Sequence, residues 1–155
     1  MHTNAIMRDV LDADVLIAAP VAKTNSSTGV GLSLKGQMGL VLDRGSMHSH
    51  YDLDTAIVDL CSRIKPDLAV VDATRVLSTN EPYGPGKGLH PNEVIASPNP
   101  VAADALTVAS YEWYGRSIAP LKVGHIALAH AWPRAHGRGE PERAKDCRLA
   151  LGERP

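Results

Sequence analysis

Lysines, hydroxyls and glycines gather just after the first apolar run of the chain, and together they suit an anion. This segment reads Lys23-Thr24-Asn25-Ser26-Ser27-Thr28-Gly29, and Lys35 follows soon after it. Lysine supplies a full positive charge, and glycine lets backbone N–H groups approach a phosphate or carboxylate. The spacing of glycine and lysine does not match the Walker pattern. Lys23, Thr24, Thr28 and Lys35 are therefore candidate ligand-binding residues, with an ordinary solvated loop as the alternative.

A second segment of this kind follows the next apolar run, and it reads Tyr83-Gly84-Pro85-Gly86-Lys87-Gly88. Its backbone donors and its lysine make Gly84, Gly86 and Lys87 candidate ligand-binding residues. The spacing is not that of a Rossmann fingerprint. The alternative is that glycine and proline only shape a turn here.

Two carboxylates stand next to apolar residues. Asp72 directly follows Leu68-Ala69-Val70-Val71, and Asp104 lies in an apolar stretch. A buried carboxylate needs a ligand, a metal or a backbone partner, so the alternative for Asp72 is to accept N–H bonds from the next loop. Asp104 is expected to be paired inside, although the outer face of a helix is an alternative. Asp72, Asp104 and Lys35 are the candidate catalytic residues, as acid, base or metal ligand.

His48 and His50 are the candidate metal ligands. In an extended segment, alternate residues share a face, so the two imidazoles would lie near one ion. Two ligands do not make a site, and Asp72 or Asp104 would have to complete it. Solvated loop histidines are the alternative. No serine sits in a nucleophile elbow and neither cysteine has an evident base nearby, so the sequence does not support covalent catalysis.

The elements that must position these residues alternate between strands and helices. Apolar, β-branched runs predict strands at 15–19, 68–71 and 94–96, and the segment 24–31 is expected to be a loop. Helices are predicted at 4–11, 32–42, 53–64, 101–114 and 121–131, with Asp52 and Asn99 as N-caps. This order predicts an α/β fold with a small, mostly parallel sheet flanked by helices in a Rossmann-like, three-layer arrangement. Residues just past Ala19, Val71 and Ala96 should then meet at one rim of the sheet.

The length and composition predict one α/β domain at 1–132 and a disordered, charged tail at 133–155. Charge, apolar runs and cysteine count also exclude several classes of protein. A net charge of -1 with scattered basic residues argues against nucleic acid. The apolar runs are too short for a membrane span and no secretory signal is visible, so we expect a cytoplasmic protein. Two cysteines cannot hold an iron–sulfur cluster, and Cys61 is expected to be a buried apolar thiol.

Short motifs in a fixed order carry a family resemblance. They are Asp14-Val15-Leu16-Ile17, Pro20-Val21-Ala22-Lys23-Thr24, Thr28-Gly29, Leu34-Lys35-Gly36-Gln37-Met38-Gly39, His48, Asp59-Leu60, Lys65-Pro66-Asp67-Leu68, Val71-Asp72-Ala73, Gly84-Pro85-Gly86 and Pro98-Asn99-Pro100-Val101-Ala102-Ala103-Asp104. From about Ile6 to Ala131 the chain resembles the family called domain of unknown function 362, whose members are often associated with ferredoxin-like iron–sulfur modules. The resemblance implies a shared site at Lys23, Lys35, His48, Asp72, Gly84, Gly86 and Asp104.

The chain departs from the family pattern at two positions. Members commonly have a histidine two residues after the first lysine, where this chain has Asn25. An asparagine usually follows the second lysine, where this chain has Gly36. Members also carry a long segment before the first strand, so we expect this chain to correspond to the C-terminal half of the family.

Two functions remain open at this point. The first is binding of a small anionic ligand, with or without a divalent metal, and the sequence does not decide whether a reaction follows. The second is a non-catalytic assembly or accessory module that serves a ferredoxin-like iron–sulfur redox partner. A three-stranded parallel sheet has exposed edges, which predicts a homodimer or a larger assembly.

Overall fold

The computed structural model describes residues 4–132 and 147–150, and for the second range it describes the backbone alone. In this part of the chain, seven strands form one sheet: β1 (Ile17–Ala18), β2 (Val21–Asn25), β3 (Gly29–Gly31), β4 (Leu68–Leu77), β5 (Gly88–Leu89), β6 (Glu93–Ser97) and β9 (Cys147–Ala150). A separate pair joins β7 (Glu112–Trp113) and β8 (Arg116–Ser117). The α-helices are α1 (Arg8–Leu11), α2 (Ser33–Gly36), α3 (Arg44–Ser49), α4 (Leu53–Arg63), α5 (Pro100–Ser110) and α6 (Gly124–Ala131), with 3₁₀ turns η1 (Gln37–Leu40) and η2 (Pro120–Lys122). The α/β class is confirmed.

The sheet is mixed. Its order is β3-β2-β4-β6-β9, and β1 and β5 also pair with β4. Strand β1 runs parallel to β4 as predicted, and so does β2, which lies outside the predicted strands. Strand β6 runs antiparallel to β4, with Ala69 opposite Ser97. Parallel neighbours need a crossover, usually a helix, and the chain between β4 and β6 forms only the short strand β5. The prediction of three parallel strands was therefore wrong at the third.

This reversal also breaks the predicted rim. Lys23 on β2 lies opposite Leu77 at the far end of β4, whereas Ser97 lies opposite Ala69 near its start. The segment after Ala96 therefore leaves the sheet at the other end from the segment after β2. Only the first two of the three predicted loops share an end of the sheet.

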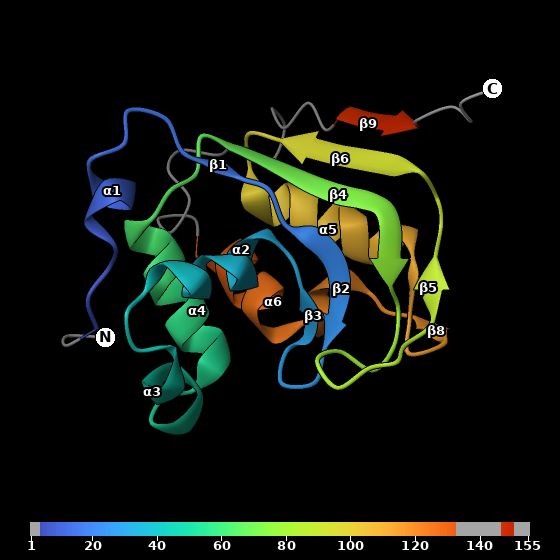
Figure 1. Ribbon diagram of the computed structural model, residues 1–155, viewed down its shortest axis with the longest axis horizontal. Coiled ribbons are helices and arrows are strands. Elements are labelled where there is room, and N and C mark those ends of the chain that lie inside the picture. Colours follow the sequence, from blue (N-terminus) through green and yellow to red (C-terminus); the bar gives the residue numbers. More distant parts are fainter. Residues whose placement is uncertain (1–3, 133–146, 151–155) are drawn as a thin grey trace.

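The helices cover one face of the sheet (Figure 1). Along β4, Ala69, Val71 and Ala73 are fully buried, whereas Val70 and Asp72 between them are half-exposed. Helix α5 packs on β4 and β6, and α2 packs on β3 and β4. The described residues thus form two layers, and the second helical layer of a Rossmann-like arrangement is not among them. An antiparallel return from β4 to β6 places no crossover helix on the other face.

Both long helices begin where the sequence predicts. The Asp52 carboxylate accepts the backbone N–H of Thr55 at 2.9 Å and starts α4. The Asn99 side chain accepts the N–H of Val101 at 3.0 Å, and Pro100 occupies the first turn of α5. The buried side of α4 includes Cys61, only 2% exposed, as predicted for an apolar thiol. Burial raises the pKa of this thiol far above its ordinary value.

The predicted loop and tail differ from the structure in part. Residues 21–31 form the β2–β3 hairpin, in which Ala22 and Thr24 are buried. Strand β9 lies inside the predicted disordered tail and pairs antiparallel with β6. An edge strand with free N–H and C=O groups accepts such an addition. The rest of the predicted tail, 133–146 and 151–155, lies outside the described residues. Among the described helices, none combines the length and the apolar character that a bilayer crossing requires.

Candidate anion-binding site

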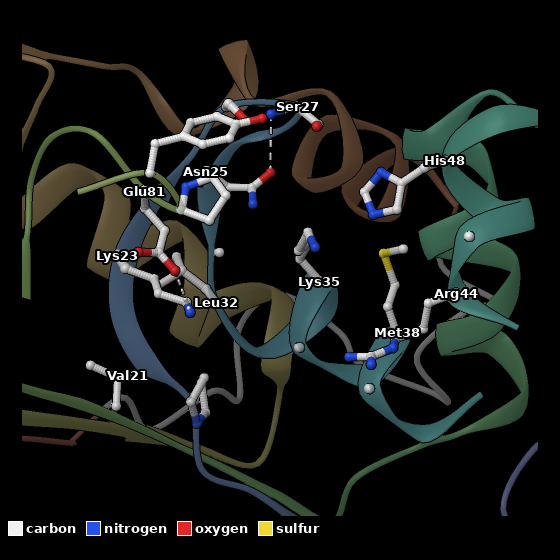
Figure 2. Close-up of a pocket in the computed structure, with 18 residues that line it drawn as sticks. Val21, Lys23, Asn25, Ser27, Leu32, Lys35, Met38, Arg44, His48 and Glu81 are labelled. Atoms are coloured by element: carbon white, nitrogen blue, oxygen red, sulfur yellow. Dashed lines mark hydrogen bonds and ion pairs between the residues drawn. The ribbon is translucent and has the colours of Figure 1, made fainter. Parts of the chain in front are cut away.

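A cleft of about 720 Å³ opens beside the β2–β3 hairpin (Figure 2). It is enclosed by the hairpin, α2, η1, α3 and the loop that follows β4. Its polar and charged lining residues are Lys23, Asn25, Ser26, Ser27, Lys35, Arg44, His48, Glu81 and Tyr83. Three residues predicted from the sequence as site residues, Lys23, Lys35 and His48, therefore meet in one cleft.

Helix α2 carries Lys35, and Asp104 holds the start of this helix. Leu32 precedes α2 and its side chain makes no capping hydrogen bond. Instead the Asp104 carboxylate, from α5, accepts the backbone N–H of Ser33 and of Leu34, each at 2.9 Å. Asp104 is fully buried and does not line the cleft. It holds the turn that carries Lys35, which confirms that Asp104 is paired inside. A catalytic role for Asp104 finds no support in this placement.

Burial sets the charge state of Asp104. It raises the pKa of the carboxyl group to about 6, while the N–H bonds from Leu34 and Ser33 oppose the rise. The two N–H groups are the donors that the first turn of a helix leaves unpaired. The carboxylate satisfies both, so α2 stays folded although it has only four residues.

Lys35 is the half-buried cation of the cleft. Figure 2 shows its side chain rising from α2 into the space between Lys23 and His48. Burial lowers the pKa of its ammonium group, and the positive charges of Lys23 and Arg44 lower it further. Within the described residues the ammonium group forms no ion pair. The site therefore holds more positive charge than its own carboxylates neutralise.

Lys23 is partly neutralised by the loop after β4. Its Nζ lies 2.9 Å from Oε1 of Glu81. The backbone N–H of Glu81 in turn donates to the hydroxyl of Thr24 at 3.4 Å. Thr24 is fully buried and does not line the cleft, and its hydroxyl ties the loop to β2. Its predicted role as a direct ligand contact finds no support in this placement.

The hairpin turn presents two serines to the cleft. The Asn25 side chain accepts the N–H groups of Ser27 and Thr28 at 3.1 and 3.2 Å and the Thr28 hydroxyl at 2.9 Å. Thr28 also donates to the Val30 carbonyl at 2.9 Å. Thr28 is thus occupied within the hairpin and outside the cleft lining, contrary to its predicted role. The turn keeps Ser26 and Ser27 at the mouth of the cleft.

Arg44 is a cleft residue that sequence reasoning missed. It begins α3, whose N-cap Asp43 accepts the N–H of Ser46 at 3.0 Å. Arg44 and His48 are four residues apart, so they share one face of α3, and both line the cleft. Recognising the helix from the Asp43–Ser46 capping pattern would have revealed this pair.

The other predicted residues lie elsewhere. The Asp72 carboxylate accepts the N–H and the hydroxyl of Thr74 at 2.8 and 2.7 Å on the uncovered face of the sheet. The backbone N–H that it accepts belongs to Thr74 in the same strand, β4, and not to the next loop as the alternative had it. Gly84, Gly86 and Lys87 follow the cleft residues Glu81 and Tyr83 in the same loop but do not line the cleft. Gly86 has a packing role, because a Cβ there would collide with the carbonyl oxygen of Thr79.

The predicted metal site does not assemble. His48 lies on helix α3 and His50 caps its end, so the extended geometry that would align them is missing. The His50 ring contacts Ser49 and lies outside the cleft lining, as does Asp72. Among the described residues, no group of three histidine, cysteine or acidic side chains is placed to hold a metal ion.

A family model matches most of the chain. Its description is Domain of unknown function (DUF362), and the match covers residues 1–109. The chain belongs to this family. Every residue that lines the cleft lies within the DUF362 match, including the two departures from the family pattern, Asn25 and Gly36. The comparisons with curated proteins and with solved structures give no match.

Proposed function

We propose that the cleft binds a small anionic ligand, with Lys35 and Arg44 as its main cationic contacts. One observation carries the proposal: three cationic side chains line the cleft, and the carboxylate of Glu81 is already paired with Lys23 at 2.9 Å. An anion between Lys35 and Arg44 would offset their mutual repulsion. The guanidinium group offers a planar fork for two oxygens of a phosphate or carboxylate, and the ammonium group adds a point charge.

The lowered pKa of Lys35 supports the same function. A half-buried ammonium group near two other cations is an unfavourable arrangement in the empty protein. Ligand binding would supply the missing negative charge and make the protonated form favourable. Lys35 and His48 both line the cleft and are the residues best placed to transfer a proton to a bound anion. Lys35 therefore keeps the catalytic role that the sequence predicted for it.

A divalent metal does not fit this lining. Lys23, Lys35 and Arg44 would repel a cation, and Glu81 is engaged by Lys23. Hard divalent ions take several oxygen ligands, mostly carboxylates. We therefore propose anion binding without a metal bound by the described residues of the cleft.

The alternative role and the assembly state stay predictions. No feature of the described residues favours an accessory role beside a ferredoxin-like iron–sulfur partner over the binding of an anion. The homodimer was inferred from a three-stranded sheet, whereas the described sheet has seven strands. The argument that exposed sheet edges favour a homodimer is weakened, since β9 covers the edge of β6.

Calorimetric titration with inorganic phosphate at constant ionic strength tests the proposed function. The test variant is Lys35→Met, which keeps the length of the side chain and removes its charge. Lys87→Met is the matched control, because Lys87 is an exposed lysine outside the cleft lining. We expect Lys35→Met to weaken binding by about tenfold or more and Lys87→Met to leave it within about twofold. Equal affinities for the two variants, or no binding by the unaltered protein, would refute the proposal.

A further inference from the structure

A small apolar pocket adjoins the cationic cleft. Its volume is about 230 Å³, below the roughly 300–1,000 Å³ typical of pockets for drug-sized ligands, so it suits one compact group. Its apolar lining comes from Leu16, Ile17, Ala18, Ala19, Leu40 and Pro66. Pro20 and Gly36 line both this pocket and the cationic cleft. The two spaces therefore meet the chain at the same two residues.

Gly36 borders both cavities and has open space beside it. Its backbone is helical, with φ -58° and ψ -30°, so any residue could occupy the position without strain. A Cβ built on Gly36 would meet no atom within 4 Å. Neither backbone geometry nor packing therefore requires glycine here. A side chain would instead fill space between the two cavities.

The wall of the apolar pocket also holds polar atoms without partners. Ser33 and Gln37 line it and are 1% and 2% exposed. Neither polar atom of the Gln37 amide makes a hydrogen bond within the described part of the chain. Buried polar groups in native proteins are nearly always paired, so this amide lacks a partner that a ligand could supply.

We infer that the ligand is an anion that carries one compact, mainly apolar group, and that Gly36 is the specificity-determining residue that admits this group. The inference rests on the proposed function. The anionic part lies against Lys35 and Arg44, and the apolar group passes Gly36 into the pocket beside Leu40. Burial of the group adds affinity through the hydrophobic effect. A free inorganic anion would leave the apolar pocket unused.

Two probes with the same headgroup test this inference: inorganic phosphate and phenyl phosphate, titrated by calorimetry at constant ionic strength. For the unaltered protein we expect phenyl phosphate to bind at least about tenfold more tightly, because burial of even one methylene in an apolar pocket is worth about that factor. In Gly36→Leu the ratio of the two affinities should fall to about one. The control is Gly39→Leu, since Gly39 also faces open space but lines the cationic cleft alone. Its ratio should stay near that of the unaltered protein.

Each outcome separates this inference from the proposed function. Equal affinity of both probes for the unaltered protein would overturn the inference and leave anion binding intact. A ratio unchanged by Gly36→Leu, or one that falls equally in Gly39→Leu, would overturn the role of Gly36. Absence of binding by either probe would overturn both. If Gly36→Leu fails to fold by circular dichroism, Gly36→Ala provides the same comparison with a smaller expected fall in the ratio.

Discussion

The carboxylate of Asp104 accepts the backbone N–H of Leu34 at 2.9 Å, one residue before the lysine that enters the cleft. Helix α5 thereby fixes the first turn of α2 from inside the protein. This contact explains how a buried acid 69 positions away in the sequence can matter for Lys35 without touching the cleft. Asp104 is accordingly a positioning residue, and its charge state should be visible in the stability of the protein.

Replacing Asp104 with Asn should remove a pH-dependent part of the free energy of unfolding. The folded pKa of about 6 lies above the ordinary 3.8, so the folded state holds the proton more tightly. The stability that this group contributes is fully present below about pH 4 and is lost as the pH rises through 6, by on the order of 3 kcal/mol. Asn should also lose one of the two N–H bonds, because only one of its side-chain groups is an acceptor.

Urea unfolding of the unaltered protein and of Asp104→Asn at pH 4, 5, 6 and 7 measures this effect. The free energy of unfolding of the unaltered protein should fall relative to that of the variant across this range. Parallel pH profiles would show that Asp104 does not titrate there.

Two glycines should respond in opposite ways to alanine. Gly86→Ala should destabilise the protein by about 1–3 kcal/mol, because the new Cβ collides with the Thr79 carbonyl. Gly36→Ala should stabilise the protein by roughly 0.5–1 kcal/mol, since the position is helical and open. Thermal unfolding of the two variants, followed by circular dichroism, checks both expectations. A neutral Gly86→Ala would return this glycine to the candidate ligand-binding set.

Replacing Gln37 with Met should stabilise the protein without ligand. Both polar atoms of its amide are buried and unpaired within the described residues, and such a group costs about 1–3 kcal/mol. Met has a similar shape and needs no hydrogen bond, so we expect a gain of about 1 kcal/mol. Urea unfolding measures it. A loss of stability would mean that the amide already has a partner, such as an internal water molecule.

Apolar periodicity and capping residues predicted the helices and strands whose formation depends on residues close together in the sequence. Helices α4 and α5 follow their apolar periodicity and caps, and β4 and β6 follow their apolar runs. The hairpin was missed because its inward positions, Ala22 and Thr24, are small or polar, which hides the alternation of a strand. The direction of β6 was missed although the absence of a predicted helix between 71 and 94 already indicated an antiparallel return.

The candidate site was predictable only in part, for a related reason. Lys23, Lys35 and His48 belong to segments that the β2–β3 hairpin, α2 and α3 bring together near one end of β2. Asp72 and Asp104 were grouped with them on the assumption of parallel strands, and the structure places both outside the cleft. Arg44 was missed because the Asp43–Ser46 capping pattern of α3 was not recognised. Glu81 joins the site through tertiary packing, which no local motif reveals.

The pKa of the Lys35 ammonium group, measured by NMR titration of its side chain with and without inorganic phosphate, tests the central claim most directly. Without phosphate, the account predicts a pKa below the ordinary lysine value of 10.5, caused by burial and by the nearby Lys23 and Arg44 charges. Saturating phosphate should raise this pKa, and anion affinity should fall as the pH rises through it. A Lys35 pKa that phosphate does not change would contradict an anion bound beside Lys35.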